Sequence, residues 1–186
     1  MLSANTPAQS LQPLQPSPTS SFLLVASHKL TTSWFRETVI VVTRRGHRGP
    51  IGIIVNRPSD IMLDKVFPAY LAAKDIRLFA GGPVDPQQVS YLFRGEEALV
   101  AGALKISEHI YLAYGMPLLG ELLGGIRPHT GLRVVNGLAA WAPGQLENEI
   151  ARGDWYVLPI DGEAIFDRSA GEMWPELFRR ATIISH

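Results

Sequence analysis

Residues 38–56, TVIVVTRRGHRGPIGIIVN, decide the fold of this chain. The first six residues are rich in β-branched side chains and the last six form a second apolar run, so each run predicts a strand. The polar connection between them contains two glycines, which predicts a β-hairpin. Because both runs are apolar on both faces, we expect this hairpin to lie in the middle of the core and to be covered on each side. We expect Pro58 to stop the second strand, since proline cannot donate to a strand ladder.

Shorter strands and helices are predicted on either side of the hairpin. The expected strands are Phe22–Ala26, Ile76–Ala80, Val89–Phe93, Leu104–Ile106, Ile110–Tyr114, Leu132–Asn136 and Trp155–Leu158. Helical spacing predicts helices over Met116–Leu123, Pro143–Arg152 and Ala170–Arg180, and a kinked or divided helix over Leu63–Lys74. Strands and helices mix without strict alternation. We therefore predict an α+β (mixed α/β) fold, a single compact domain with a mixed, strongly buried sheet or partial barrel flanked by helices.

Composition and charge exclude several classes of protein. The 186 residues are 46% hydrophobic, which is enough for a buried core over residues 21–186. Lysine plus arginine equals aspartate plus glutamate at 17 each, so a globally basic nucleic-acid binder is disfavoured. The chain has no cysteine, which excludes disulfide frameworks, thiolate zinc sites, iron–sulfur clusters and cysteine nucleophiles.

The first twenty residues differ from the rest of the chain. They carry no charged side chain and contain four prolines, so we expect a disordered tail over residues 1–20 rather than a targeting signal. The apolar runs elsewhere are of strand length, far below the ~20 residues that a membrane-crossing helix needs. We expect a cytoplasmic protein that does not enter the membrane.

Segments spread over most of the chain resemble the bacterial YqgE/AlgH family. They are Phe22–Ala26, Trp34–Ile40, Gly49–Pro58, Gly81–Val84 and Asn136–Ile150, followed by Trp155. The patterns G-x-I-V-N-x-P and W-x-x-G-Q-L-E-x-E, in this order and at this separation, are specific to it. The chain departs from the family at Leu138, at Ala140 and over residues 88–91, where an arginine before an aromatic residue is missing.

This resemblance implies a compact α/β fold in a bacterial cytoplasmic protein. The family is largely uncharacterised, and its label of transcriptional regulator comes from a link to alginate production. It has no established catalytic residues to transfer to this chain. The resemblance therefore implies a binding or regulatory protein that acts on transcription indirectly.

The stretch from Asn136 to Glu149 is the first candidate site. A strand there enters a glycine-containing loop and then a helix start, an arrangement that favours an anion. The candidate residues for a ligand or partner are Gly137, Trp141, Gly144, Gln145 and Glu149. The alternative is a tight turn with the tryptophan packed in the core. Glu147 and Glu149 point to different helix faces, which argues against an acid–base pair.

Two further candidates are the glycine-rich segment at residues 81–83 and the asparagine at position 56. Gly81, Gly82 and Pro83 either line a cleft or form a turn that uses positive φ. Asn56 ends a buried strand and either bonds neighbouring loop backbone or contacts a ligand.

A basic loop at the tip of the predicted hairpin is the candidate contact for an anion or nucleic acid. Its arginines are Arg44, Arg45 and Arg48. From position 36 to 57 there are five arginines and one glutamate, a local charge of +4. The alternative is a solvated loop that keeps the hairpin soluble. No helix-turn-helix with a basic recognition helix is visible, so direct DNA binding is disfavoured.

The sequence contains no pattern for catalysis or metal binding. The five histidines do not stand at metal-ligand spacing, and no G-x-S-x-G elbow is present. Ser107, Glu108 and His109 are adjacent, so on a strand their side chains point apart. We expect no metal, no cofactor and no catalytic residues.

The preferred hypothesis is therefore a non-enzymatic protein that acts through an unknown protein or small-molecule partner, as a monomer or a weak homodimer. One alternative is a hydrolase-like enzyme that uses the Gly81 and Gly137 loops as its pocket. Another is a nucleic-acid binder that uses the basic hairpin.

Overall fold

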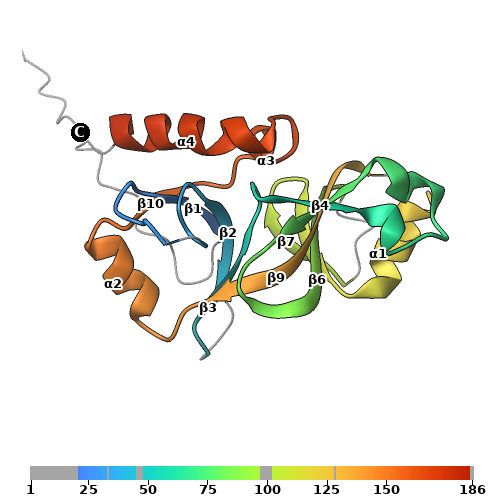
Figure 1. Cartoon of the computed structure of the whole chain (residues 1–186), viewed down its shortest axis with the longest axis horizontal. Helices are drawn as coiled ribbons and strands as arrows, with labels where there is room; N and C mark the ends of the chain where they lie inside the picture. The colour runs from blue at the N-terminus through green and yellow to red at the C-terminus, as the bar shows by residue number, and fades with distance from the viewer. Residues whose placement is uncertain (1–20, 33, 45–47, 97–101, 128, 185–186) are drawn as a thin grey trace, which may run out of the picture.

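The fold is built on one large sheet with helices against it. The structure is a computed structural model that describes residues 21–32, 34–44, 48–96, 102–127 and 129–184. Within these ranges the strand order is β10-β1-β2-β3-β9-β6-β8-β7, with β4 paired to β5 and β5 paired to β9 (Figure 1). The predicted α+β fold with a buried sheet is confirmed. The tail predicted over residues 1–20 lies outside the described residues.

The strands are β1 (Phe22–Ala26), β2 (Val39–Arg44), β3 (Pro50–Ile54), β4 (Pro58–Met62), β5 (Arg77–Ala80), β6 (Val84–Arg94), β7 (Leu104–Ser107), β8 (Ile110–Tyr114), β9 (Thr130–Ala140) and β10 (Trp155–Leu158). The α-helices are α1 (Met116–Leu123), α2 (Gln145–Ala151), α3 (Gly162–Phe166) and α4 (Ala170–Ile184). Two short 3₁₀ helices, η2 (Leu63–Lys65) and η3 (Leu71–Asp75), occupy the stretch predicted as a kinked or divided helix.

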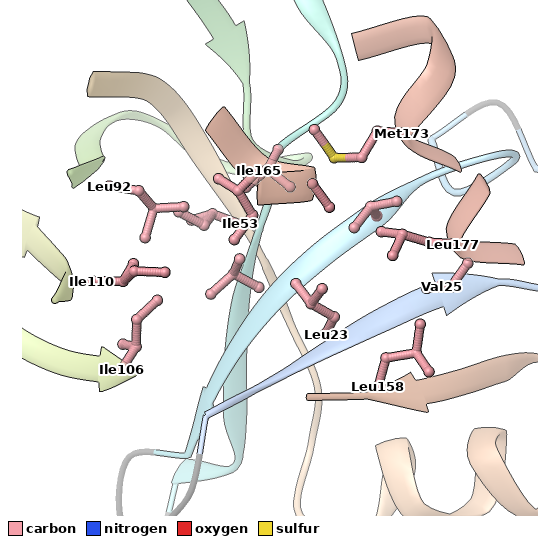
Figure 2. Packing of buried hydrophobic residues seen from close by; sticks show 14 of the residues in the cluster. Leu23, Val25, Ile53, Leu92, Ile106, Ile110, Leu158, Ile165, Met173 and Leu177 are labelled. Atoms are coloured by element: carbon pink, nitrogen blue, oxygen red, sulfur yellow. The ribbon is translucent and has the colours of Figure 1, made fainter. Parts of the chain in front are cut away.

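The β2–β3 hairpin lies in the middle of the core, as its sequence predicts. The two strands are antiparallel, with Ile40 opposite Ile54. Alternate residues of β2 enter different hydrophobic clusters: Val41 shares one with Met173 of α4, and Ile40 shares another with Leu146 of α2. Figure 2 shows the first cluster, with side chains of α4 above those of β1. Both faces of the hairpin are therefore covered, which explains why apolar and polar residues do not alternate along its strands.

The long strand β9 connects the two halves of the molecule. It pairs antiparallel with β3 at Ala140, antiparallel with β6 along most of its length, and parallel with β5. Beyond it, the face of β6 and β8 packs against α1 through a third cluster that includes Tyr91 and Leu119. In Figure 1, β9 runs between the part containing α4 and the part containing α1. Residues on β9 can therefore contact both halves.

Two local predictions differ from the structure. β3 already ends at Ile54, and Pro58 begins β4 instead of stopping a strand, because the first residue of a strand tolerates a missing N–H. The helix α3 was not predicted, because five residues are too few for a periodic pattern. Its N-terminus is capped by Asp161, whose carboxylate accepts a hydrogen bond from the Ala164 N–H at 3.0 Å.

Candidate functional site

The residues predicted around Trp141 form one hydrogen-bonded cluster, which we call the Glu149 clamp. Both indole N–H groups, of Trp141 and Trp155, donate to Oε2 of Glu149 at 2.9 Å. The Gln145 side chain donates to Oε1 at 2.9 Å and accepts from the Ala142 N–H at 3.0 Å. The clamp therefore joins the end of β9, the helix α2 and the edge strand β10.

The Glu149 clamp explains most of the W-x-x-G-Q-L-E-x-E pattern in structural terms. Both tryptophans are buried, so each indole N–H needs an acceptor inside the protein. One carboxylate supplies that acceptor for both. Gly144 precedes α2 with φ +80, a left-handed conformation that glycine adopts without a Cβ penalty.

The glycines at 81, 82 and 137 mark a close crossing of two backbone segments. A Cβ on Gly81 would lie 2.3 Å from the Gly137 carbonyl oxygen, and one on Gly82 would lie 2.2 Å from the Leu138 carbonyl carbon. The Gly81 N–H donates to Asn136 O at 2.7 Å across this crossing. The space beside these glycines is thus occupied by backbone, while Pro83 next to them is exposed. The crossing accounts for the G-G-P segment without a ligand.

Asn56 joins the end of β3 to the start of β2. Its Oδ1 accepts from the Val39 N–H at 2.8 Å, and its Nδ2 donates to Glu37 O at 2.9 Å. This is the bonding of loop backbone that the sequence suggests for an asparagine at a strand end. Asn56 also lines a cavity.

That cavity has a volume of about 380 Å³, and we call it the Arg36–Arg57 cavity. Its lining comes from the two open ends of the β2–β3 hairpin and from the first residues of α4. The lining residues are Arg36, Glu37, Asn56, Arg57, Ala170, Gly171, Trp174 and Pro175. Arg57 donates from Nη2 to Arg36 O at 3.3 Å, and its Cζ lies 5.8 Å from the centre of the Trp34 ring.

Positive charge is concentrated in the Arg36–Arg57 cavity. Burial lowers the pKa of Arg57 from its ordinary value, and the neighbouring charge of Arg36 lowers it further. Two arginines and one acidic residue, Glu37, are among the lining residues. An anion placed between the arginines would reduce their mutual repulsion.

The sequence patterns did not indicate Arg36, Arg57 or Trp174 as site residues. The available signal was the position of Arg57 directly after Asn56 in the G-x-I-V-N-x-P pattern, together with the local charge of +4. The contribution of α4 could not be found in this way, because Trp174 is more than 100 residues away from both arginines.

The arginines predicted at the hairpin tip are described only in part. Arg48 is exposed to solvent, whereas Arg45 and the side chain of Arg44 lie outside the described residues. The hypothesis of a nucleic-acid contact at this tip stays a prediction.

A second cavity, of about 580 Å³, lies beside the β7–β8 hairpin. It contains Ser107 and His109, but His109 Nε2 lies 3.7 Å from Glu108 Oε1 and both of those side chains are exposed. Its two arginines form ion pairs, Arg94 with Asp167 and Arg180 with Asp161 at 2.5 Å. Arg94 lowers the pKa of Asp167 by hydrogen bonding to it. With three acidic side chains and two arginines in its lining, this hollow is the more acidic of the two.

The described residues were also considered as metal ligands and as membrane-crossing segments. They hold no group of three or more histidine, aspartate or glutamate side chains placed as metal ligands would be. Across the same ranges, no helix combines the length and the apolar composition that crossing a bilayer requires.

Comparison with known proteins identifies the family. The sequence pattern described as AlgH-like (DUF179) matches residues 23–185. A UPF0301 protein of Methylococcus capsulatus is 33% identical over 168 residues, covering 88% of this chain and 91% of the relative. A UPF0301 protein of Pelodictyon phaeoclathratiforme is 33% identical over 159 residues, covering 84% and 83%.

Two solved structures share the fold. The crystal structure of a protein from Corynebacterium diphtheriae matches with a TM-score of 0.77 and 25% identity, over 91% of this chain and 89% of that one. The solution structure of the AlgH protein from Pseudomonas aeruginosa matches with a TM-score of 0.70 and 22% identity, over 91% and 92%. Because the family pattern matches residues 23–185 and the relatives cover more than four fifths of the chain, the chain belongs to the AlgH-like family.

Proposed function

We propose that this protein is a non-enzymatic binding protein that recognises an anionic group in the Arg36–Arg57 cavity. The observation that carries the proposal is that two arginines, one just before β2 and one just after β3, line the same hollow at the open end of the hairpin, together with residues of α4. The cavity suits a small molecule or a single side chain, so any effect on transcription would be indirect.

Arginine is the side chain best suited to such a site. Its planar guanidinium offers donors that match the oxygens of a phosphate or carboxylate, and it keeps its charge when partly buried. Here Arg57 is held by its bond to Arg36 O and by the Trp34 ring, so little side-chain entropy would be lost on binding.

The proposal also states that the protein has no catalytic activity. The groups that a reaction would need have structural bonds: the Glu149 carboxylate accepts three hydrogen bonds, and the Asn56 amide has a partner on each end. His109 Nε2 lies 3.7 Å from Glu108 Oε1, and both of these side chains are exposed, which is not the geometry of a buried proton relay.

The test is calorimetric titration of the full chain with inorganic pyrophosphate at fixed low ionic strength. We expect binding that weakens at least tenfold in Arg36→Gln and in Arg57→Gln. Arg179→Gln is the matched control, because it removes the same charge from an exposed position on α4. Thermal denaturation establishes that each variant is folded.

Two results would overturn the proposal. One is no binding of pyrophosphate by the wild-type protein at millimolar concentration. The other is unchanged binding in a folded variant that carries both Arg36→Gln and Arg57→Gln.

A further inference from the structure

The Arg36–Arg57 cavity has an aromatic wall as well as a cationic one. Trp174 and Pro175 of α4 line it opposite the hairpin ends. The indole N–H of Trp174 donates to Ala26 O at 2.9 Å, so the polar edge of this ring is already occupied by the fold. The ring is further fixed by His28 and Phe178, at 5.3 and 5.0 Å between centres. What Trp174 can offer a ligand is therefore carbon surface on a rigid support.

The third part of the lining is the acidic residue Glu37. Glu37 has φ +56, a left-handed conformation that residues with a Cβ rarely adopt. The bond from Asn56 Nδ2 to Glu37 O holds it there, on the turn that also carries Trp34 and Arg36. Strained backbone that is held by its surroundings is found preferentially where a side chain must be placed for binding.

Trp34 connects these parts from outside the cavity. Its ring is 39% exposed, and the Arg57 guanidinium lies over it. The turn that carries Trp34 is anchored, since the Arg36 N–H donates to Thr32 O at 3.0 Å and the Phe35 ring packs edge-on against Trp155. Trp34 therefore supports the position of Arg57, while Trp174 is the aromatic surface inside the cavity.

We propose that the ligand of the Arg36–Arg57 cavity is a nucleotide, a molecule that joins a phosphate to a planar base through a sugar with hydroxyl groups. The phosphate lies between Arg36 and Arg57, the base packs against Trp174, and the Glu37 carboxylate accepts hydrogen bonds from the ribose hydroxyls. The cavity volume of about 380 Å³ is within the range of small-molecule sites. This inference rests on the proposed function and adds the chemical class of the ligand.

A simple phosphate would not use the whole lining. Inorganic phosphate or pyrophosphate would engage the arginines but would meet repulsion from Glu37 and leave Trp174 uncovered. A base stacked on an aromatic side chain adds binding energy that does not depend on the phosphate and that any of the bases can supply. The combination of two cations, one carboxylate and an indole therefore favours a nucleotide over a bare anion.

The test compares ligands that differ in one part at a time. The full chain is titrated with adenosine monophosphate, 2′-deoxyadenosine monophosphate, ribose 5-phosphate and pyrophosphate, and tryptophan fluorescence is recorded in parallel. We expect adenosine monophosphate to bind at least tenfold more tightly than ribose 5-phosphate, which has the same phosphate and sugar, and to quench the fluorescence.

Variants separate the three walls of the cavity. Glu37→Gln is expected to tighten pyrophosphate binding while abolishing the preference for the ribo- over the deoxyribonucleotide. Trp34→Leu is expected to weaken the binding of adenosine monophosphate and of ribose 5-phosphate equally. Trp174→Leu is expected to remove the tighter binding of adenosine monophosphate relative to ribose 5-phosphate. If Trp174→Leu does not fold, the wild-type ligand series and Glu37→Gln still decide the question.

Equal affinity for adenosine monophosphate and ribose 5-phosphate, without quenching, would overturn the nucleotide inference and leave anion binding intact. No preference for ribose, or no effect of Glu37→Gln on it, would overturn the role of Glu37. Failure of pyrophosphate to bind would overturn the proposed function itself, whatever the other three ligands do.

Discussion

The substitution Glu149→Ala tests the Glu149 clamp directly. It removes the acceptor of two indole N–H groups, each from a tryptophan no more than 5% exposed. A buried donor without a partner costs about 1–3 kcal/mol, so the two together cost roughly 2–6 kcal/mol. The donor of Gln145 faces solvent and adds little. We expect the free energy of unfolding to fall by about 4 kcal/mol.

Urea denaturation followed by tryptophan fluorescence measures this loss. A protein of this size loses roughly 2–4 °C in melting temperature per kcal/mol, so the variant should melt about 8–16 °C below the wild type. Glu149→Gln retains one oxygen for the two indoles and is expected to lose about 1 kcal/mol. Asn148→Ala, an exposed change on the same helix, is the control and should stay within about 0.5 kcal/mol.

A free energy of unfolding of Glu149→Ala within about 0.5 kcal/mol of the wild-type value would contradict this prediction. Such a result would mean that the indole N–H groups find other acceptors or water, and the W-x-x-G-Q-L-E-x-E pattern would then need a functional explanation.

Two other substitutions test the remaining structural arguments. Gly81→Ala would place a Cβ 2.3 Å from the Gly137 carbonyl oxygen and should lower the free energy of unfolding by about 3 kcal/mol or more in thermal denaturation. Gly171→Ala, with open space around the added Cβ, should raise the free energy of unfolding slightly. Equal effects of the two substitutions would contradict the close crossing. In Asp161, burial raises the pKa, but hydrogen bonds from the helix backbone and from Arg180 lower it overall below its ordinary value. The stability from this shift is present above about pH 4 and lost as the pH falls through the lowered pKa. Asp161→Asn, which keeps an oxygen for the helix cap, should therefore unfold about 1 kcal/mol more easily than the wild type at pH 7 in urea titrations, and this difference should shrink as the pH falls below about 4. A difference that does not shrink in acid would contradict the ion-pair argument.

Local patterns were enough for the elements whose partners are near in sequence. The β2–β3 hairpin follows from two β-branched runs joined by a few residues, because such strands pair with each other before anything else can reach them. The helix α1 follows in the same way from Met116–Leu123 and the glycine after it. The patterns G-x-I-V-N-x-P and W-x-x-G-Q-L-E-x-E, in this order and at this separation, also indicated the family without any coordinates.

Elements held by distant partners were predicted too short or not at all. The strand predicted over Leu132–Asn136 extends to Thr130–Ala140, through Gly131 and Gly137, because β3, β5 and β6 supply its hydrogen bonds. Glycines in such a run locally favour a turn, and pairing with three other strands overrides that preference.

The composition and patterning of the sequence thus determined the fold class, the central hairpin and the family. The tertiary structure alone decided what the polar residues do. It turned Trp141 and Glu149 into a clamp with Trp155, and it closed the space between Gly81 and Gly137 with backbone. It also brought Trp174 to the arginines of the hairpin ends. The physical reason is that packing a helix across a sheet joins residues whose separation in the chain leaves no trace in local periodicity.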